Sequence, residues 1–367
     1  MKTALIVGGT AATGLPIIEE VKRRGYEVTI YHRGEHEVPG VADLEHIHGE
    51  PHFAETIARD LHGRRWDLVV ATYGRIRFLA EALVGKTERL ITVGGSVVKR
   101  LPGVPARESD GYVEPGNSLV DRMIETEQTV LRGHTEGHYV STVVRYPYVY
   151  GPFSIIVPEW HVIQRVRDGR TRWIAPGGGL GISTRCAAPN AAHTIGLAID
   201  RPEVAGGQIY QVADDRQYTF REWTQMIARL LHYEFEFVDI PWSVFPVPLS
   251  GGALGGGGAL SAVPQGGGPR SHNLLSNLKA KTELGYADVV TPEAWMRETL
   301  DHFLAHPPPI DGVGNHLKPE EFDYVAEDRL LGWWAGVVAS APSDVGTIVT
   351  RRHPYPHPRR PGEEREG

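Results

Sequence analysis

The chain has 367 residues, of which 41% are hydrophobic and 23% charged, and its formal net charge is −7. This length suffices for one large or two moderate domains with a sizeable core. The acidic balance, without a basic stripe in the body of the chain, argues against nucleic acid as a partner. The single cysteine, Cys186, excludes an internal disulfide, and every apolar run is shorter than the ~20 residues that span a membrane. We therefore expect a cytoplasmic protein without a membrane partner.

The first thirty-odd residues predict a dinucleotide-binding unit. Residues 3–8 form an apolar run long enough for one buried strand, and a glycine-containing turn over residues 8–14 leads into a helix with one apolar face. Residues 27–32 predict a second strand after Gly25. Strand, turn, helix and strand together can hold a dinucleotide, because the glycines let the backbone approach a pyrophosphate at the helix N-terminus.

The spacing within this turn departs from the full glycine pattern. Gly8 and Gly14 hold the outer positions of G-x-x-G-x-x-G, but Ala11 stands in the middle, where its methyl group narrows the approach of a phosphate without preventing it. A merely structural turn is the alternative. The predicted pyrophosphate contacts are Gly8, Gly9, Thr10, Ala11, Ala12, Thr13 and Gly14.

The end of the second strand is where such folds select their cofactor. Tyr31 and His32 offer no carboxylate to a ribose 2′-hydroxyl, whereas Arg33 can pair with a 2′-phosphate. We therefore favour NADP over NAD, although Glu35 lies close in sequence. The alternative is an arginine that is only solvated.

Histidines surround the next predicted strand, residues 44–48. His46 and His48 share a face because alternate strand residues do, and His52 follows shortly after. No cysteine or clear carboxylate completes a tetrahedral set. We therefore predict no metal site and expect histidines that face solvent or form hydrogen bonds.

Strands and helices continue to alternate, which predicts an α/β fold with a Rossmann-type, doubly wound parallel sheet. Two polar segments, Thr72–Gly74 and Gly94–Ser96, follow strands of this sheet at the carboxyl ends, where open sheets bind ligands. The further strands are predicted at 66–71, 89–93 and 139–145, and helices at 53–61, 76–83 and 117–131.

Residues 145–152 read R-Y-P-Y-V-Y-G-P, which resembles the R-P-x-N-V-Y-G-P stretch of the extended short-chain dehydrogenases/reductases, the NAD-dependent epimerase/dehydratase family. Residues 283–286 are similar to the late E-L-G-Y stretch of that family, and residues 219–222 form a capping box that opens a helix, as the family usually has there. Residues 186–200 take the place of a family helix but lack its His and Asp. The resemblance extends over residues 1–305.

We expect three parts, of which the first two follow from the resemblance and the third lies outside it. Residues 1–152 form the dinucleotide-binding domain, to which residues 187–215 return, and residues 153–305 form a smaller substrate-binding portion. Residues 306–367 form a helical extension, with a helix over 319–338 and a basic tail; its aromatic side chains pack on the core or on a second copy in a homodimer. The glycine-rich residues 250–268 are either a disordered insertion or a lid over substrate.

The resemblance also implies which other side chains line the cofactor and which chemistry is missing. Family members carry Tyr-x-x-x-Lys near the start of the long helix, where the pair exchanges a proton with substrate as hydride moves. Here Leu119 and Met123 occupy those positions, and neither can move a proton. The expected cofactor-lining residues beyond the turn are His32, Arg33, Glu50, Ala71, Thr72, Tyr73, Pro147 and Val149, and the candidate replacements for the catalytic pair are Tyr73, Ser96, Tyr148 and Arg122.

Two functions of different classes follow from these residues. One is an NAD(P)-dependent oxidoreductase or epimerase/dehydratase-like enzyme, which acts on a carbonyl, enone or imine of a small organic molecule with a non-standard proton donor. The other is a non-catalytic NAD(P)-binding sensor that kept the fold and lost the catalytic pair.

Overall fold

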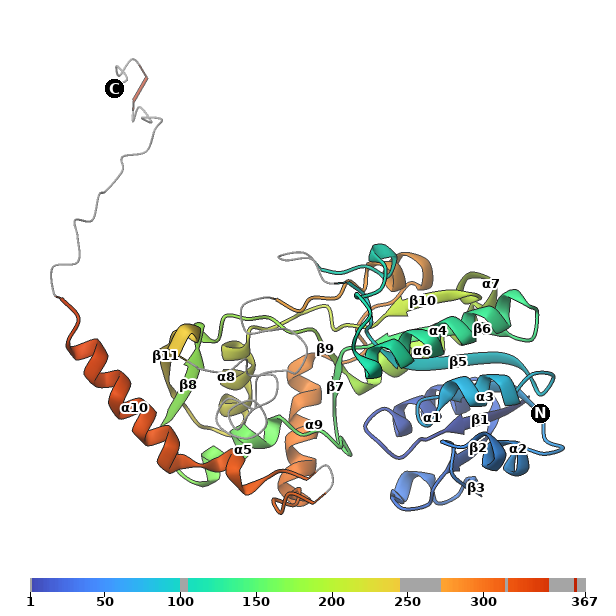
Figure 1. Ribbon diagram of the computed structural model, residues 1–367, viewed down its shortest axis with the longest axis horizontal. Coiled ribbons are helices and arrows are strands. Elements are labelled where there is room, and N and C mark those ends of the chain that lie inside the picture. Colours follow the sequence, from blue (N-terminus) through green and yellow to red (C-terminus); the bar gives the residue numbers. More distant parts are fainter. Residues whose placement is uncertain (1, 100–104, 245–271, 314–315, 343–359, 362–367) are drawn as a thin grey trace. The chain divides into compact units, whose positions relative to one another are not determined.

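The computed structural model describes residues 2–99, 105–244, 272–313, 316–342 and 360–361 (Figure 1). The chain divides into two compact units, residues 1–324 and 325–367. The glycine-rich residues 250–268 lie outside the described part, as does the basic tail except for residues 360–361. None of the described helices is long and apolar enough to cross a membrane.

A seven-stranded sheet forms the centre of the first unit, in the order β10-β6-β5-β4-β1-β2-β3, and its neighbouring strands are all parallel. The predicted doubly wound Rossmann-type sheet is therefore confirmed. The order reverses at β1 and β4, so that ligands are expected beyond the carboxyl ends of these strands. The strands are β1 (Lys2–Val7), β2 (Tyr26–His32), β3 (Glu45–His48), β4 (Trp66–Ala71), β5 (Thr87–Gly95), β6 (Val140–Tyr146) and β10 (Gln208–Gln211).

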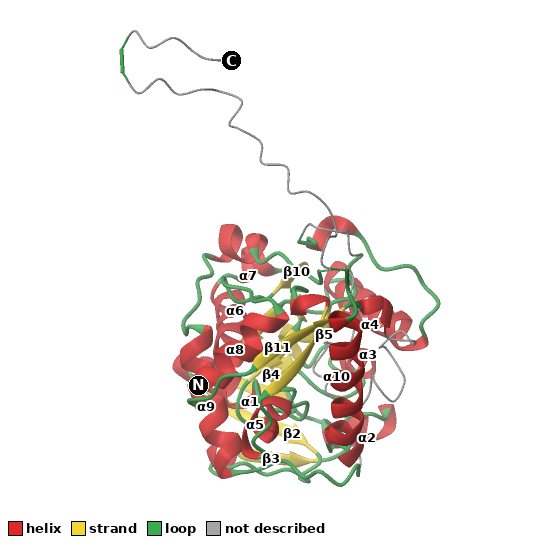
Figure 2. Cartoon of the chain, turned by 90° about the vertical axis from the view of Figure 1, so that its left-hand side faces the viewer, coloured by secondary structure: helices red, strands yellow, loops and turns green. Residues whose placement is uncertain are grey.

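Helices cover both faces of this sheet (Figure 2). Apolar side chains of α1 and α6 join one face in one core cluster, and those of α2, α3 and α4 join the other face in a second cluster. The helices are α1 (Gly14–Arg23), α2 (Ala54–Asp60), α3 (Ile76–Ala82), α4 (Ser118–Thr135), α6 (Ala188–Asp200) and the short α7 (Pro202–Ala205).

Local sequence signals set several helix starts. The Asn117 side chain accepts hydrogen bonds from the amides of Leu119 and Val120, which caps α4. Thr219 and Glu222 form the predicted capping box. These contacts satisfy amides that the helix itself leaves without partners.

A further hydrophobic core lies within the first unit, built around Trp160, Trp223 and Phe303. Two short parallel pairs, β7 with β9 and β8 with β11, accompany it. Sequence reasoning missed these strands, since pieces of three to five residues carry too little periodicity. The elements are β7 (Tyr148–Tyr150), α5 (Glu159–Arg167), β8 (Arg172–Pro176), β9 (Arg185–Ala187), α8 (Phe220–Leu230), β11 (Glu236–Ile240) and α9 (Pro292–Ala305).

The predicted helix over residues 319–338 is present in two pieces. A 3-10 turn over Pro319–Phe322 ends at Asp323, and α10 (Tyr324–Ala339) follows. Pro319 at the first position favours the start of the turn. Proline has no backbone N–H, and at this position an N–H would have no partner within the turn.

Candidate functional site

The turn between β1 and α1 has the geometry that a pyrophosphate requires. Gly8 and Gly9 have φ angles of 98° and 106°, a region that side chains with a Cβ rarely adopt. The amides of Ala11, Ala12 and Thr13 donate to no other residue in the described ranges, so they remain available to an anion at the N-terminus of α1. The turn therefore fits a dinucleotide phosphate.

Close packing holds this turn in place. A Cβ on Gly14 would lie 2.1 Å from the carbonyl oxygen of Gly9, so no larger residue fits. A Cβ on Gly8 would lie 2.7 Å from the hydroxyl of Thr72, which itself donates to the carbonyl of Val7 at 3.0 Å. The glycine turn and the end of β4 thus form one wall.

The end of β2 provides one cationic side chain. Arg33 pairs with Glu35 at 2.7 Å and lies 4.0 Å from Glu50. The buried ring of His32 is turned toward His46 instead, with 3.0 Å between Nε2 and Nδ1. Of the cofactor-lining residues predicted here, Arg33 and Glu50 are therefore neighbours, whereas the His32 side chain faces another group.

Tyr73 lies beside this group. Its ring is 5.8 Å from the Arg33 guanidinium and 4.9 Å from the ring of His52, which contacts the Glu50 carboxyl group. Burial raises the pKa of Tyr73, and the Arg33 charge opposes that rise only in part. Its hydroxyl forms no hydrogen bond with another described residue, so a protonated phenol is free to donate.

A pocket of about 720 Å³ opens next to Tyr73, between the ends of β4 and β5 and the helices α3 and α4. Thr72 lines it and also contacts the glycine turn, so pocket and turn adjoin. Arg75 and Arg122 line the same pocket, and within the described part of the chain neither forms an ion pair. The pocket therefore favours an anionic ligand. Sequence reasoning missed Arg75, although it follows Tyr73-Gly74 directly.

Leu119 and Met123 lie in this pocket as well. A Cβ on Gly95, at the end of β5, would meet the Met123 methyl at 2.3 Å, so Met123 covers the strand end where a proton-transferring lysine is expected from the resemblance. Beneath them, Arg145 and Glu127 form a buried ion pair with contacts of 2.6 and 2.8 Å. This pair fixes α4 against β6.

Ser96 and Tyr148 do not line the pocket. The Ser96 hydroxyl donates to Gln211 on β10 at 3.2 Å. The Tyr148 hydroxyl donates to Glu159 on α5 at 2.8 Å, and burial raises the pKa of both groups. Of the four candidate catalytic residues, the structure thus brings Tyr73 and Arg122 together.

The remaining cofactor-lining candidates lie along the same carboxyl edge of the sheet. Ala71 is the last, fully buried residue of β4. Tyr146 pairs with Gly95 across β5 and β6, so Pro147 and Val149 follow at the edge where β5 ends. The edge therefore runs from the end of β2 past β1 and β4 to β6.

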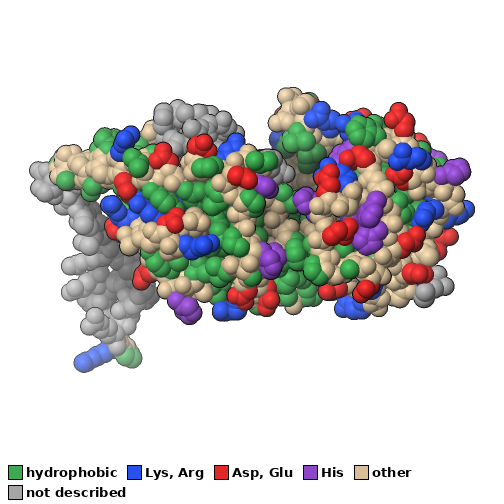
Figure 3. Space-filling model, turned by 90° about the horizontal axis from the view of Figure 1, so that it is seen from below, with side chains coloured by type: hydrophobic (Ala, Val, Ile, Leu, Met, Phe, Trp, Pro, Cys, Tyr) green, Lys and Arg blue, Asp and Glu red, His purple; other side chains and the backbone are tan. Residues whose placement is uncertain are grey.

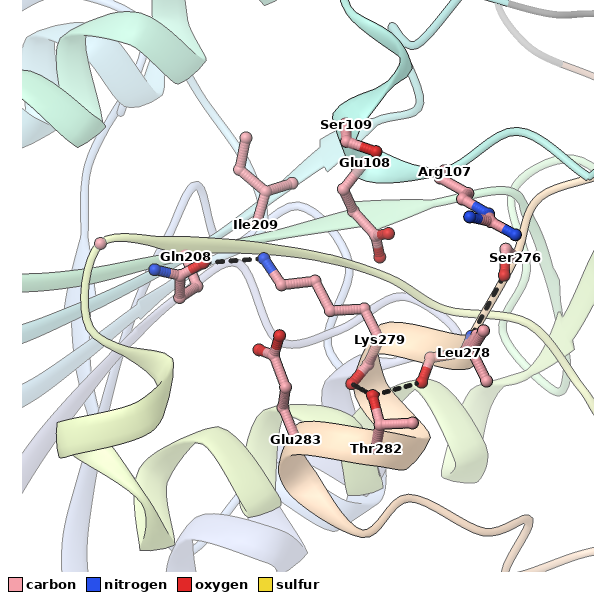
Figure 4. Close-up of a pocket in the computed structure, with 11 residues that line it drawn as sticks. Arg107, Glu108, Ser109, Gln208, Ile209, Ser276, Leu278, Lys279, Thr282 and Glu283 are labelled. Atoms are coloured by element: carbon pink, nitrogen blue, oxygen red, sulfur yellow. Dashed lines mark hydrogen bonds between the residues drawn. The ribbon is translucent and has the colours of Figure 1, made fainter.

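A second pocket, of about 460 Å³, lies beside β10, the edge strand at the far end of the sheet from β3 (Figure 4). Lys279 projects into it and donates to Gln208 at 2.8 Å. Burial raises the pKa of Glu108 on the opposite wall. Neither the glycine turn nor any candidate catalytic residue lines this pocket, which is therefore separate from the first.

The three histidines at 46, 48 and 52 do not lie together in the structure. His46 and His48 lie with His32 and Glu37, whereas His52 contacts Glu50 and Tyr73. The parallel pairing of β2 with β3 decides this, because it sets His32 opposite His48.

No family model matches the chain. The chloroplast stem-loop binding protein of 41 kDa b of Arabidopsis thaliana is 24% identical over 264 residues, which cover 64% of this chain and 68% of that protein. Solved structures align more widely but at low identity. They include the UDP-glucose 4-epimerase of Thermotoga maritima, with a TM-score of 0.65 at 16% identity over 83% of this chain and 99% of that one.

Two structures with bound NAD give the same result. The UDP-glucose 4-epimerase of Thermus thermophilus aligns with a TM-score of 0.64 at 19% identity, over 83% of this chain and 99% of that one. The dTDP-glucose 4,6-dehydratase of Streptomyces venezuelae aligns with a TM-score of 0.63 at 16% identity, over 83% and 97%. The chain therefore has the fold of the NAD-dependent epimerases and dehydratases, as its sequence resemblance implies.

Proposed function

We propose that the protein binds NAD(P) at the glycine turn and acts as an oxidoreductase or epimerase/dehydratase-like enzyme on a small organic molecule in the adjoining pocket. The observation that carries this proposal is the shared wall at Thr72, which contacts the turn on one side and lines the pocket on the other. A cofactor and a second ligand can therefore meet there.

The chain's own residues suit this role. The N-terminus of α1 and the amides of Ala11 to Thr13 hold the pyrophosphate, and Arg33 lies where a ribose 2′-phosphate would bind. Bound NAD(P) supplies a hydride or accepts one. NADP is the proposed cofactor because β2 ends in His32, without a carboxylate for a 2′-hydroxyl.

The substrate is proposed to carry a carbonyl, enone or imine together with an anionic group. Arg75 and Arg122 line the pocket without an ion-pair partner among the described residues, and such charges attract phosphates or carboxylates. The proteins of the same fold that act on UDP-glucose and dTDP-glucose make nucleotide sugars the first compounds to test.

Tyr73 is proposed as the proton donor, because its hydroxyl has no hydrogen-bond partner in the described part of the chain, whereas those of Ser96 and Tyr148 donate to Gln211 and Glu159. General acid–base help is typically worth about 10²–10⁴ in rate, so Tyr73→Phe should lower turnover by a good part of that factor and leave cofactor affinity unchanged. Tyr26→Phe, at the amino end of β2, is the matched control and should keep full turnover.

The assay follows cofactor oxidation with ketones, enones, imines and nucleotide sugars at several pH values. Full turnover by Tyr73→Phe would show that Tyr73 is not the proton donor. Tight cofactor binding without turnover on any substrate would favour the non-catalytic sensor. A wild-type protein that binds neither NAD(H) nor NADP(H) would refute the proposal itself.

A second candidate function is binding of a nucleic-acid stem-loop, which the name of the Arabidopsis relative suggests. Arg75 and Arg122 in the first pocket could contact phosphates, but the net charge of −7 opposes this function. Titration with RNA and DNA stem-loops at rising salt tests it, since the logarithm of an affinity built on phosphate contacts falls linearly with the logarithm of salt concentration. No binding at low salt would exclude this function.

A further inference from the structure

Three histidines and a glutamate converge where β2 and β3 end. One donor atom from each of His32, Glu37, His46 and His48 lies within 4.8 Å of the other three. Figure 3 views the molecule from below, the side on which β3 lies in Figure 1, and shows histidine and acidic side chains near one another at this surface. We call these four residues the histidine cluster.

Strand pairing brings the three imidazoles together. His32 and His48 are the last residues of β2 and β3 and pair directly, and His46 lies two residues before His48 on the same face. Ring centroids are 5.1, 5.1 and 5.5 Å apart, with tilted or edge-on planes rather than stacked ones. One nitrogen of each ring lies within 4.8 Å of a nitrogen of the other two.

The loop after β2 supplies the carboxylate. Gly34 has a φ of 77°, and a Cβ there would lie 3.2 Å from the His48 ring, so a glycine lets the loop turn closely over this imidazole. Glu37 then returns to the cluster. Its Oε1 lies 3.5 Å from His32 Nε2, 3.7 Å from His46 Nδ1 and 3.6 Å from His48 Nε2.

A backbone contact fixes which nitrogen of His46 faces the centre. Nε2 of His46 lies 2.9 Å from the carbonyl oxygen of Val41, which can only accept. Nε2 therefore carries the hydrogen, and the lone pair of Nδ1 points into the cluster. Histidines that bind metals are usually held in this way, with the other ring nitrogen donating to a carbonyl.

We propose that the histidine cluster binds one divalent transition-metal ion of the Zn²⁺ type, with three imidazole nitrogens and one carboxylate oxygen. Zn–N and Zn–O bonds of about 2.0–2.2 Å in a tetrahedron separate neighbouring donors by about 3.3–3.6 Å. Four of the donor separations are 3.0, 3.5, 3.6 and 3.7 Å, so small side-chain movements complete the site.

The surroundings favour a structural site with access from solvent. Four protein donors fill a tetrahedron, which is typical of structural rather than catalytic zinc. His32 is 5% exposed, while Glu37 and His48 are 47% and 59% exposed, so an ion can enter from the open side. The bound ion would join β2, β3 and the loop between them.

The experiment uses full-length protein without an affinity tag, stripped with a chelator and titrated with Co²⁺ as a coloured substitute for Zn²⁺. Four-coordinate Co²⁺ absorbs visible light far more strongly than hydrated Co²⁺, so the spectrum reports the geometry. The variants are His48→Gln and Glu37→Gln, both at exposed positions. His36→Gln, exposed in the same loop but outside the cluster, is the matched control.

We expect one Co²⁺ per chain with intense visible bands in the wild type and in His36→Gln. His48→Gln and Glu37→Gln should bind at least about a hundredfold more weakly, since loss of an outer partner alone costs roughly 10–100-fold. Zn²⁺ should raise the melting temperature of the wild type and of His36→Gln, but not of the other two variants.

Other histidines offer a competing explanation, because the chain has 17 of them. Binding of equal strength in the wild type, His48→Gln and Glu37→Gln would show that the ion sits elsewhere and would overturn the proposal. A spectrum typical of octahedral Co²⁺ that neither His48→Gln nor Glu37→Gln changes would also overturn the proposal. Circular dichroism of each variant confirms that the compared proteins are folded.

Discussion

At the scale of single residues, Arg33 and Glu35 decide whether a 2′-phosphate is recognised. Their ion pair of 2.7 Å is solvent-exposed, and a phosphate must compete with Glu35 for the guanidinium. Arg33→Ala should weaken NADP(H) binding by about ten- to a hundredfold, because a charge-assisted hydrogen bond is worth about 1.5–3 kcal/mol. NAD(H) affinity should not change.

Glu35→Gln tests the same contact with the opposite sign. This variant releases Arg33 from its partner, so NADP(H) should bind more tightly while NAD(H) again stays unchanged. Both cofactors are titrated by fluorescence against the wild type and the two variants. Equal NAD(H) and NADP(H) affinities that neither substitution alters would show that Arg33 does not contact the cofactor.

At the scale of elements, the turn between β1 and α1 depends on contact between two glycines. The methyl group that Gly14→Ala introduces would lie 2.1 Å from the Gly9 carbonyl oxygen, so the turn must open. We expect a loss of about 1–3 kcal/mol in the free energy of unfolding, as for other overpacked sites, together with weaker cofactor binding. Urea unfolding and cofactor titration measure the two effects.

Gly181→Ala is the matched control for this turn. Nothing lies within 4 Å of a Cβ at Gly181, and its φ is outside the left-handed region, so both properties should stay near those of the wild type. Wild-type cofactor affinity in Gly14→Ala would mean that the dinucleotide binds elsewhere.

At the scale of the whole molecule, Asp214 links segments that are distant in the sequence. Its buried carboxylate accepts hydrogen bonds from the Tyr150 hydroxyl, the Ala187 amide and the Asn190 side chain. Burial nevertheless raises its pKa to about 6. The folded state therefore holds a proton more tightly than the unfolded state, and Asp214 favours folding at low pH.

Protonated Asp214 stabilises the folded state fully at pH values below about 4, the pKa of an aspartate in the unfolded chain. This stabilisation is lost as the pH rises through about 6, and a pKa shift of two units corresponds to about 3 kcal/mol in the free energy of unfolding. Asp214→Asn keeps the amide contacts and removes the charge. The difference in free energy of unfolding between Asp214→Asn and the wild type should therefore change in favour of the variant from about pH 4 to about pH 7. Urea unfolding at several pH values measures this difference. A difference that stays constant with pH would contradict this expectation. Asp301→Asn, at an exposed position, is the control, and its difference from the wild type should stay constant.

Much of the fold could be predicted from the sequence, because its signals are local. Apolar runs such as residues 66–71 form buried strands, Asn117 caps α4, and the glycines of residues 8–14 form the turn. Parallel strands that alternate with helices then fix a doubly wound sheet. The expected cofactor edge follows from that sheet alone, although the roles of its residues stay predictions.

Tertiary structure alone decided which side chains meet. Three residues with a hydroxyl group follow strands of the sheet in sequence, namely Tyr73, Ser96 and Tyr148. Among the described residues, the hydroxyls of Ser96 and Tyr148 form hydrogen bonds and that of Tyr73 does not. His46 and His48 share a strand face by local geometry, but their meeting with His32 and Glu37 depends on strand register and on a loop turn. Local sequence sets backbone conformation over a few residues, whereas contacts between distant segments depend on how the whole chain packs.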